Sequence, residues 1–146
     1  MPEKETMERA REDAREGKSP STQAGEFVRE EIHHVREGKH GARSPQQAIA
    51  IGLSKARRAG VKLPPPKGGA TLRKKAAQDE RSAEHKGRKP SRRRSRATEG
   101  ALKRESRRSA TTAALSRQAK RSAAKRGGTA RSRAVTKAAR TRKARS

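Results

Sequence analysis

The sequence contains no cysteine, tryptophan or tyrosine, and its one aromatic residue of the Phe, Trp and Tyr class is Phe27. Without cysteine there is no disulfide framework and no thiolate metal site. Hydrophobic residues make up only 27% of the chain, and many of them are alanine. A core that spans the full length is therefore not expected, because too little apolar surface is available to offset the entropy of ordering the chain.

Long hydrophobic runs are also missing. No apolar stretch approaches the length of a membrane span, and the first residues are of mixed charge without an apolar segment, so neither a spanning helix nor a secretory signal is expected. What the sequence has in excess is positive charge. It contains 41 Lys and Arg against 15 Asp and Glu, a net charge of +26. This excess predicts a polyanionic partner: nucleic acid first, an anionic membrane surface second and an acidic protein third.

The charge is unevenly distributed about the three prolines at 64–66. Residues 1–63 carry a net charge of +3 and residues 64–146 a net charge of +23. Large aliphatic side chains follow the opposite trend, since the second part contains only Leu72, Leu102, Leu115 and Val135. We therefore expect the first part to pack into a small core and the second part to lack one.

An imperfect repeat divides the first part into helices. Arg-Glu-Gly-Lys occurs at 15–18 and again at 36–39, and Ser-Pro follows at 19–20 and 44–45. Glycine suits the left-handed position after a helix, serine is a good N-cap, and proline is tolerated at the first helical position. The repeat thus predicts helices over 3–16, 20–37 and 45–59.

The second and third of these helices have apolar faces. Ala24, Val28, Ile32 and Val35 share one face of the second, with Phe27 beside them, whereas the first has no real apolar stripe. In the third helix the shared face is formed by Ile49, Leu53 and Ala56, and Gly52 permits a close approach. With a short loop at 39–43, the two helices predict an αα-hairpin. This unit is near the lower size limit for independent stability, and a homodimer through the hairpin would support it.

The predicted fold class is all-α. A small helical hairpin is preceded by the helix at 3–16 and followed by a largely disordered or weakly helical basic tail. The expected organisation is a charged N-terminal helix (1–19), the hairpin (20–63), a Pro/Gly linker (64–70) and a basic low-complexity tail (71–146). Within the tail, 71–86 and 98–126 favour helix, with Thr71 and Thr98 as N-caps and glycines at 87 and 127–128 as stops. Neither has an apolar stripe, so we expect both to be frayed in free solution.

One run of residues resembles a known family. Gly38-Lys39-His40-Gly41, then Ser44 and the run QAIAIGLSKARRAG at 47–60, are similar to the signature of a family of small basic bacterial proteins with no assigned activity. The resemblance covers about residues 24–63 and implies a bacterial source and an association with DNA. It supplies no catalytic residues. The tail, in runs such as 119–126, resembles in composition the Lys/Ala-rich tails of linker histones and of tailed bacterial histone-like proteins.

The expected nucleic-acid contacts are basic residues of the tail, with small residues between them that let the chain follow a phosphate backbone. They are Arg88, Lys89, Arg92, Arg93, Arg94, Arg96, Lys103, Arg104, Arg107, Arg108, Lys120, Arg121, Lys125, Arg126, Arg131, Arg133, Arg140, Arg142 and Lys143. Three cations at the end of the third helix, Lys55, Arg57 and Arg58, would either extend this surface or complement the helix dipole. Residues 87–90 are close to the Gly-Arg-Pro core of a minor-groove hook, and equally read as one more basic turn.

Glu30, Glu31, His33 and His34 raise the question of a metal site, because Glu30 and His33 have the i, i+3 spacing of di-iron bundles. Such sites need a second motif of this kind, and the chain offers none. We therefore expect a solvated helix face there, with no metal and no cofactor. No catalytic constellation, P-loop or dinucleotide fingerprint is present, so neither an enzyme nor a small-molecule substrate is expected.

Together these features predict sequence-nonspecific nucleic-acid binding through a polybasic tail, as in a nucleoid-associated, histone-like protein of the bacterial cytoplasm. Duplex DNA is favoured over RNA, because recognition of single strands usually stacks bases on aromatic side chains. Two alternatives stay open: a protein-interaction helical module with a basic anchor, and a basic protein associated with ribosomal or other structured RNA.

Overall fold

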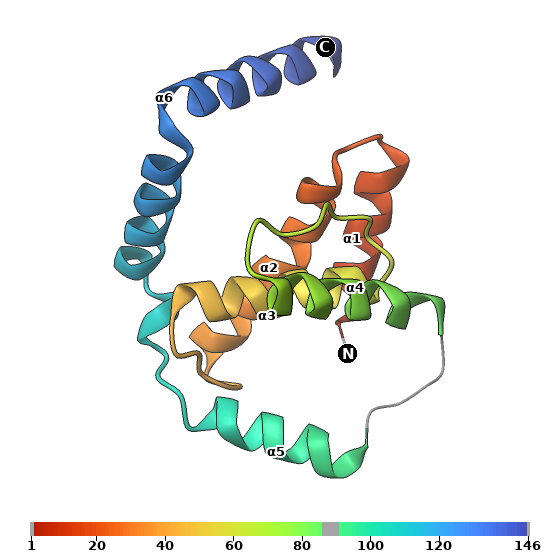
Figure 1. The fold of residues 1–146 in the computed structure, drawn as a ribbon, viewed down its shortest axis with the longest axis vertical. Coiled ribbons are helices and arrows are strands. Elements are labelled where there is room, and N and C mark those ends of the chain that lie inside the picture. Colours follow the sequence, from red (N-terminus) through yellow and green to blue (C-terminus); the bar gives the residue numbers. More distant parts are fainter. Residues whose placement is uncertain (1, 86–90, 146) are drawn as a thin grey trace. The chain divides into compact units, whose positions relative to one another are not determined.

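The computed structural model describes residues 2–85 and 91–145, and regular secondary structure in these ranges is helical, without strands. The elements are α1 (Lys4–Arg15), α2 (Pro20–Glu37), α3 (Pro45–Arg58), α4 (Ala70–Glu84), α5 (Arg92–Lys103), the short 3-10 helix η1 (Arg108–Ala110) and α6 (Thr112–Arg145) (Figure 1). The chain divides into two compact units, residues 1–111 and 112–146. Within the described residues, no helix is both long and apolar enough to cross a membrane.

The ends of the first three helices confirm the prediction from the repeat to within one residue. Ser19 and Ser44 are extended N-cap residues whose hydroxyls accept hydrogen bonds from the N–H groups of Thr22 (3.4 Å) and Gln47 (3.2 Å). Gly38 ends α2 in the left-handed conformation, with a φ of 78°. These helix boundaries are set by residues within one turn, which is why they could be read from the sequence.

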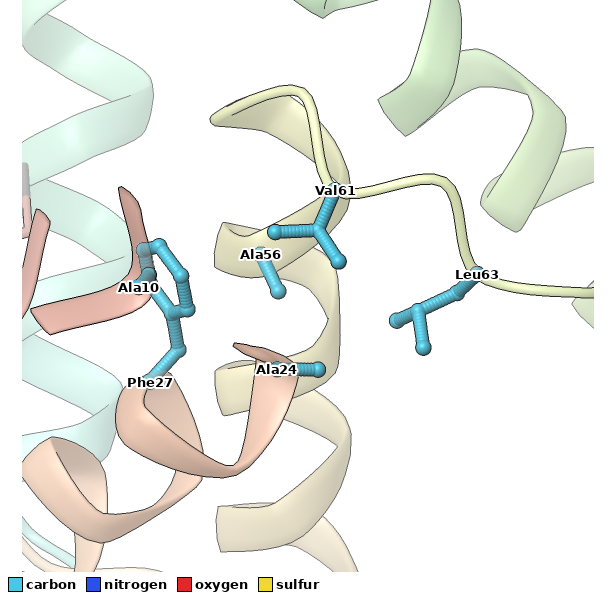
Figure 2. Close-up of a cluster of buried hydrophobic side chains, with 6 residues drawn as sticks. All are labelled: Ala10, Ala24, Phe27, Ala56, Val61 and Leu63. Atoms are coloured by element: carbon cyan, nitrogen blue, oxygen red, sulfur yellow. The ribbon is translucent and has the colours of Figure 1, made fainter. Parts of the chain in front are cut away.

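Helices α1, α2 and α3 enclose the first of two small cores. Figure 2 shows its buried members converging: Ala10, Ala24, Phe27, Ala56, Val61 and Leu63. Phe27 is the largest and is 1% exposed. The prediction that the first helix has no real apolar stripe underestimated it, because Met7 and Ala10 both pack into this core.

The face that α3 buries differs from the predicted one. Ala48, Gly52 and Ala56 are buried, whereas Ile49 and Leu53 are only half-buried. A Cβ atom on Gly52 would lie 2.6 Å from the Cα of Val28, so α2 and α3 approach closely at this point. The close approach expected from Gly52 is thus confirmed, and it explains the different face: where two helix backbones nearly touch, only the smallest residues fit.

The predicted hairpin followed by a disordered tail is wrong. Helix α4 packs against α3, and η1 packs against both α2 and α3. Ala110 joins the second core with Val35, Ala42 and Ala48. The 39–43 loop also bonds to the chain before η1: the Gly41 N–H donates to the Leu102 carbonyl (2.8 Å), and the Ala42 N–H to that of Ser106 (3.0 Å). Alanines, main-chain bonds and the buried carboxylate of Asp79 provide this packing, and none of them produces an apolar stripe in the sequence.

The helices of the second part also have other boundaries than predicted. The segment expected at 71–86 corresponds to α4, whose N-cap is Gly69 rather than Thr71. The single helix expected at 98–126 is replaced by α5, capped by Ser91, and by α6. Gly127 (φ 73°, ψ 168°) is non-helical, and α6 consists of two helical segments on either side of it (Figure 1). The predicted stop at 127–128 is therefore confirmed, but it is followed by a second helical segment that was not predicted.

Candidate nucleic-acid interface

All the charged residues of helix α6 are positive. Residues 112–146 contain 12 Lys and Arg and no Asp or Glu. Before the kink, Arg117, Arg121 and Lys125 follow one another at four-residue spacing and share a face of the helix, and all three are exposed. Beyond the kink, Arg133 and Lys137 repeat this spacing. At a rise of about 1.5 Å per residue, each segment spans roughly 25 Å, a length of duplex that carries about 15 phosphate charges.

Helix α5 adds a second cationic surface within the first unit. None of its residues is buried, and its first turns contain Arg92, Arg93, Arg94 and Arg96. The first turn has no acidic residue, although helix amino termini favour negative charge. Four cations at the positive end of a helix repel one another and the helix dipole. An anion placed there would relieve this repulsion.

The predicted contacts in the described part of the tail are exposed: Arg92, Arg93, Arg94, Arg96, Lys103, Arg104, Arg107, Arg108, Lys120, Arg121, Lys125, Arg126, Arg133, Arg140, Arg142 and Lys143. Two of them have a partner within the first unit. Lys103 pairs with Glu99 (3.1 Å), and the Arg107 guanidinium donates to the carbonyl of Arg36 (2.9 Å). Arg88 and Lys89 lie outside the described residues, together with the rest of the suggested minor-groove hook, and so does the side chain of Arg131.

Each of the three cations of α3 has a partner within the first unit, although Arg58 stays exposed. The Lys55 ammonium pairs with the buried carboxylate of Glu31. Arg57 is buried and donates to the Pro64 carbonyl (3.0 Å). The Arg58 guanidinium bonds to Asp79 of α4 (3.0 Å). We therefore leave these three residues out of the proposed interface.

Asp79 is the charged residue that holds α4 on α3. It is 2% exposed and accepts hydrogen bonds from Ser54 (2.7 Å), Lys75 (2.9 Å) and Arg58 (3.0 Å). Burial acts to raise the pKa of the Asp79 carboxyl, but the bonds from Ser54, Lys75 and Arg58 outweigh it and leave the pKa below its ordinary value. The ionised form of Asp79 thus belongs to the folded state.

A group of acidic and histidine side chains on α2 departs most from the sequence-based expectation. Glu30 and Glu31 were expected on a solvated face, yet they are 5% and 0% exposed. His33 is the member that stays on the surface, where it pairs with Glu37 (2.7 Å). Glu30 therefore lies with the half-buried His34, at i+4, and the prediction of a solvated face is wrong for Glu30 and Glu31.

Two residues that the sequence did not single out as ligands complete this group. Nε2 of His40, in the 39–43 loop, lies 3.1 Å from a Glu31 carboxylate oxygen. Glu3, just before α1, lies 3.1 Å from Nε2 of His34 and 3.3 Å from the ammonium of Lys39. Hydrogen bonds from these two groups, His34 first, hold the pKa of the Glu3 carboxyl below its ordinary value.

Within the described residues, two trios could each offer three ligand atoms within 4.8 Å of one another: Glu31, His34 and His40, and Glu3, Glu30 and His34. His34 belongs to both. The only sequence signal for them was the cluster of Glu and His on one helix. The contributions of Glu3 and His40 come from other elements and have no local signature.

Comparison with known proteins adds one finding. A family model described as a family of unknown function (DUF6496) matches residues 5–67. The match covers α1, α2, α3 and the prolines that follow them. No curated protein and no solved structure matches the chain. The first three helices are thus similar to a family, and α4, α5 and α6 lie outside the matched segment.

Proposed function

We propose that the protein binds duplex nucleic acid, DNA in preference to RNA, without sequence specificity and through charge. The observation that carries the proposal is α6, with its 12 Lys and Arg and no acidic residue in 112–146. A polymer of phosphates is the most abundant partner in a cell for such a surface. The Arg-rich start of α5 is a second contact surface. We infer a nucleoid-associated role in the bacterial cytoplasm.

The mechanism is phosphate neutralisation on helical scaffolds. A helix with no acidic residue and little apolar surface is a poor helix alone, because like charges at i, i+4 repel each other. Phosphates placed along it remove that repulsion and release condensed counterions. Base-edge recognition is not expected from such a surface, since contacts to phosphate fix position but carry no sequence information directly.

The test is a salt-titrated binding curve on a short duplex of random sequence. With 6 to 10 phosphates engaged, affinity should fall by about 10³- to 10⁵-fold between 50 and 200 mM salt. The chain truncated after Thr111 should bind more weakly and with a shallower slope. A shallow slope for the full chain, or a strong preference for one sequence over random competitor, contradicts the proposal.

A charge-matched pair of variants separates the proposed surface from net charge. One replaces Arg92, Arg93, Arg94 and Arg96 by serine. The control replaces four exposed cations of α1 and α2 that are outside the proposed interface: Lys4, Arg11, Arg15 and Arg29. The first variant should lower the salt slope by up to about 3 to 4, since each phosphate contact contributes about 0.9. Equal effects of the two variants would show that only total charge matters.

A further inference from the structure

A buried carboxylate oxygen of α2 has no hydrogen-bond partner. Glu30 is 5% exposed, and its Oε1 accepts a hydrogen bond from the Glu3 main-chain N–H (2.6 Å), but its Oε2 is buried and unpartnered. Burying a carboxylate is unfavourable unless it is paired and hydrogen-bonded. Such a group in a native fold points to a bound species that completes it.

Two neighbouring side chains offer the remaining ligands of a cation site. His34 follows Glu30 by four residues and so lies on the same face of α2. Glu3 reaches this face from the start of α1, with a carboxylate oxygen 3.1 Å from Nε2 of His34. One ligand atom each from Glu3, Glu30 and His34 lie within 4.8 Å of one another. The unpartnered oxygen thus belongs to a side chain that is already part of a ligand cluster.

We propose that Glu3, Glu30 and His34 bind a divalent first-row transition-metal ion, such as Zn²⁺, which fastens the start of α1 to α2. An imidazole with two carboxylates is a donor set that suits Zn²⁺, whereas Mg²⁺ and Ca²⁺ favour oxygen ligands alone. Three protein ligands leave a position for water. The ion would neutralise the two carboxylates, and it would replace Lys39 as the partner of Glu3.

The environment of His34 supports this trio over the other one. Its Nε2 faces Glu3, and its Nδ1 lies 3.8 Å from Oε1 of Glu31. A metal-bound histidine commonly donates its second ring N–H to a carboxylate, which orients the ring. A small movement of the Glu31 carboxylate toward Nδ1 of His34 would form such a hydrogen bond. In the other trio, Glu31 is itself a ligand and already carries the ammonium of Lys55 and the ring of His40. It is therefore better suited to orient His34 than to bind the ion.

Zinc binding by the full-length protein, without nucleic acid, tests the proposal. Zn²⁺ is titrated into metal-free protein in competition with a chromophoric chelator, and thermal unfolding is followed by circular dichroism with and without Zn²⁺. The expected result is one equivalent bound and a higher unfolding temperature, because a ligand that binds only the native state stabilises it. Absence of binding in the micromolar range would overturn the proposal.

Site variants with a matched control make the test specific. His34→Gln and Glu3→Gln should each lower zinc affinity at least about tenfold, as even loss of an orienting partner does at metal sites. His33→Gln is the control, because His33 neighbours His34 in sequence but has a side chain that is 67% exposed and pairs with Glu37. It should bind like the wild type.

Two results would refute the assignment: an equal loss in His33→Gln, which indicates adventitious surface binding, or full affinity in both site variants. Glu30→Gln should also lose zinc affinity. Its folding is checked by circular dichroism without metal, and Glu3→Gln keeps the test decisive if that variant does not fold, because the Glu3 side chain is 50% exposed.

Discussion

Phe27 is the largest buried side chain of the first core, and Phe27→Ala removes its ring. The residue is 1% exposed, and the other members of the cluster are alanines together with Val61 and Leu63. Figure 2 shows Ala10, Ala24 and Ala56 among the side chains of this cluster. Alanine side chains cannot move into the space that an aromatic ring leaves, so we expect a cavity to remain there. A Phe→Ala substitution at such a site costs about 3–5 kcal/mol. Domains have total stabilities of roughly 5–15 kcal/mol, so the loss is a large fraction of the total.

Urea unfolding followed by far-ultraviolet circular dichroism measures this effect, since the chain has no tryptophan or tyrosine for fluorescence. In a thermal unfolding experiment with the same detection, the midpoint should fall by at least about 12 °C, at roughly 4–8 °C per kcal/mol for a domain of this size. Leu72→Ala is the control, because Leu72 is 50% exposed and its truncation should change stability by less than about 0.5 kcal/mol.

A cost below about 1 kcal/mol for Phe27→Ala, or one equal to that of the control, would refute the packing described above. Leu53→Ala should cost less than Phe27→Ala, because Leu53 is half-buried at the edge of this core. Duplex affinity should change little in Phe27→Ala, since the cations of α6 belong to the other compact unit.

Two further predictions concern the contacts of α3. Gly52→Ala should destabilise by about 1–3 kcal/mol, because its Cβ would lie 2.6 Å from the Cα of Val28, whereas Gly25→Ala, with nothing within 4 Å, should stabilise by about 0.5–1 kcal/mol in chemical denaturation. Similar effects of the two would contradict the close approach of α2 and α3. For Asp79, the folded-state pKa lies below the ordinary value of 3.8, so its stabilisation is fully present above that pH and is lost as the pH falls toward the folded-state pKa. Asp79→Asn should remove this part of the acid dependence in a pH-dependent unfolding series, and an unchanged acid limb would show that Asp79 does not hold α4.

Local features of the fold could be predicted, and the packing of the second part could not. The serine caps and helix-ending glycines act within one turn, so the first three helices were placed to within a residue. The docking of α4 and η1 depends on Ala76, Asp79 and Ala110, which are buried at 7%, 2% and 1% exposure. An alanine or an aspartate in a charged segment is no signal of burial by itself. These residues are buried only because α2 and α3 pack against them.

The Glu and His residues of α2 show the same limit at a site. Their spacing is visible in the sequence, but a charged helix face is solvated in most proteins, and this was the expectation. Burial of Glu30 and Glu31 follows from the packing of α1 and the 39–43 loop over that face, with Glu3 and His40 contributed from outside α2. Glu3, whose main-chain N–H donates to Glu30, is 27 residues away from it in the chain.

By itself, the sequence determined the helical class, the ends of the first three helices and the concentration of positive charge beyond Pro66. Each of these follows from composition or from interactions within a turn, which do not depend on the rest of the fold. Tertiary structure alone decided which cations of α3 are bonded by distant parts of the chain. Lys55, Arg57 and Arg58 are as basic as any residue of α6, but partners on other parts of the chain engage them. Burial and pairing are sums over residues far apart in the chain, and these sums exist only once the helices have packed.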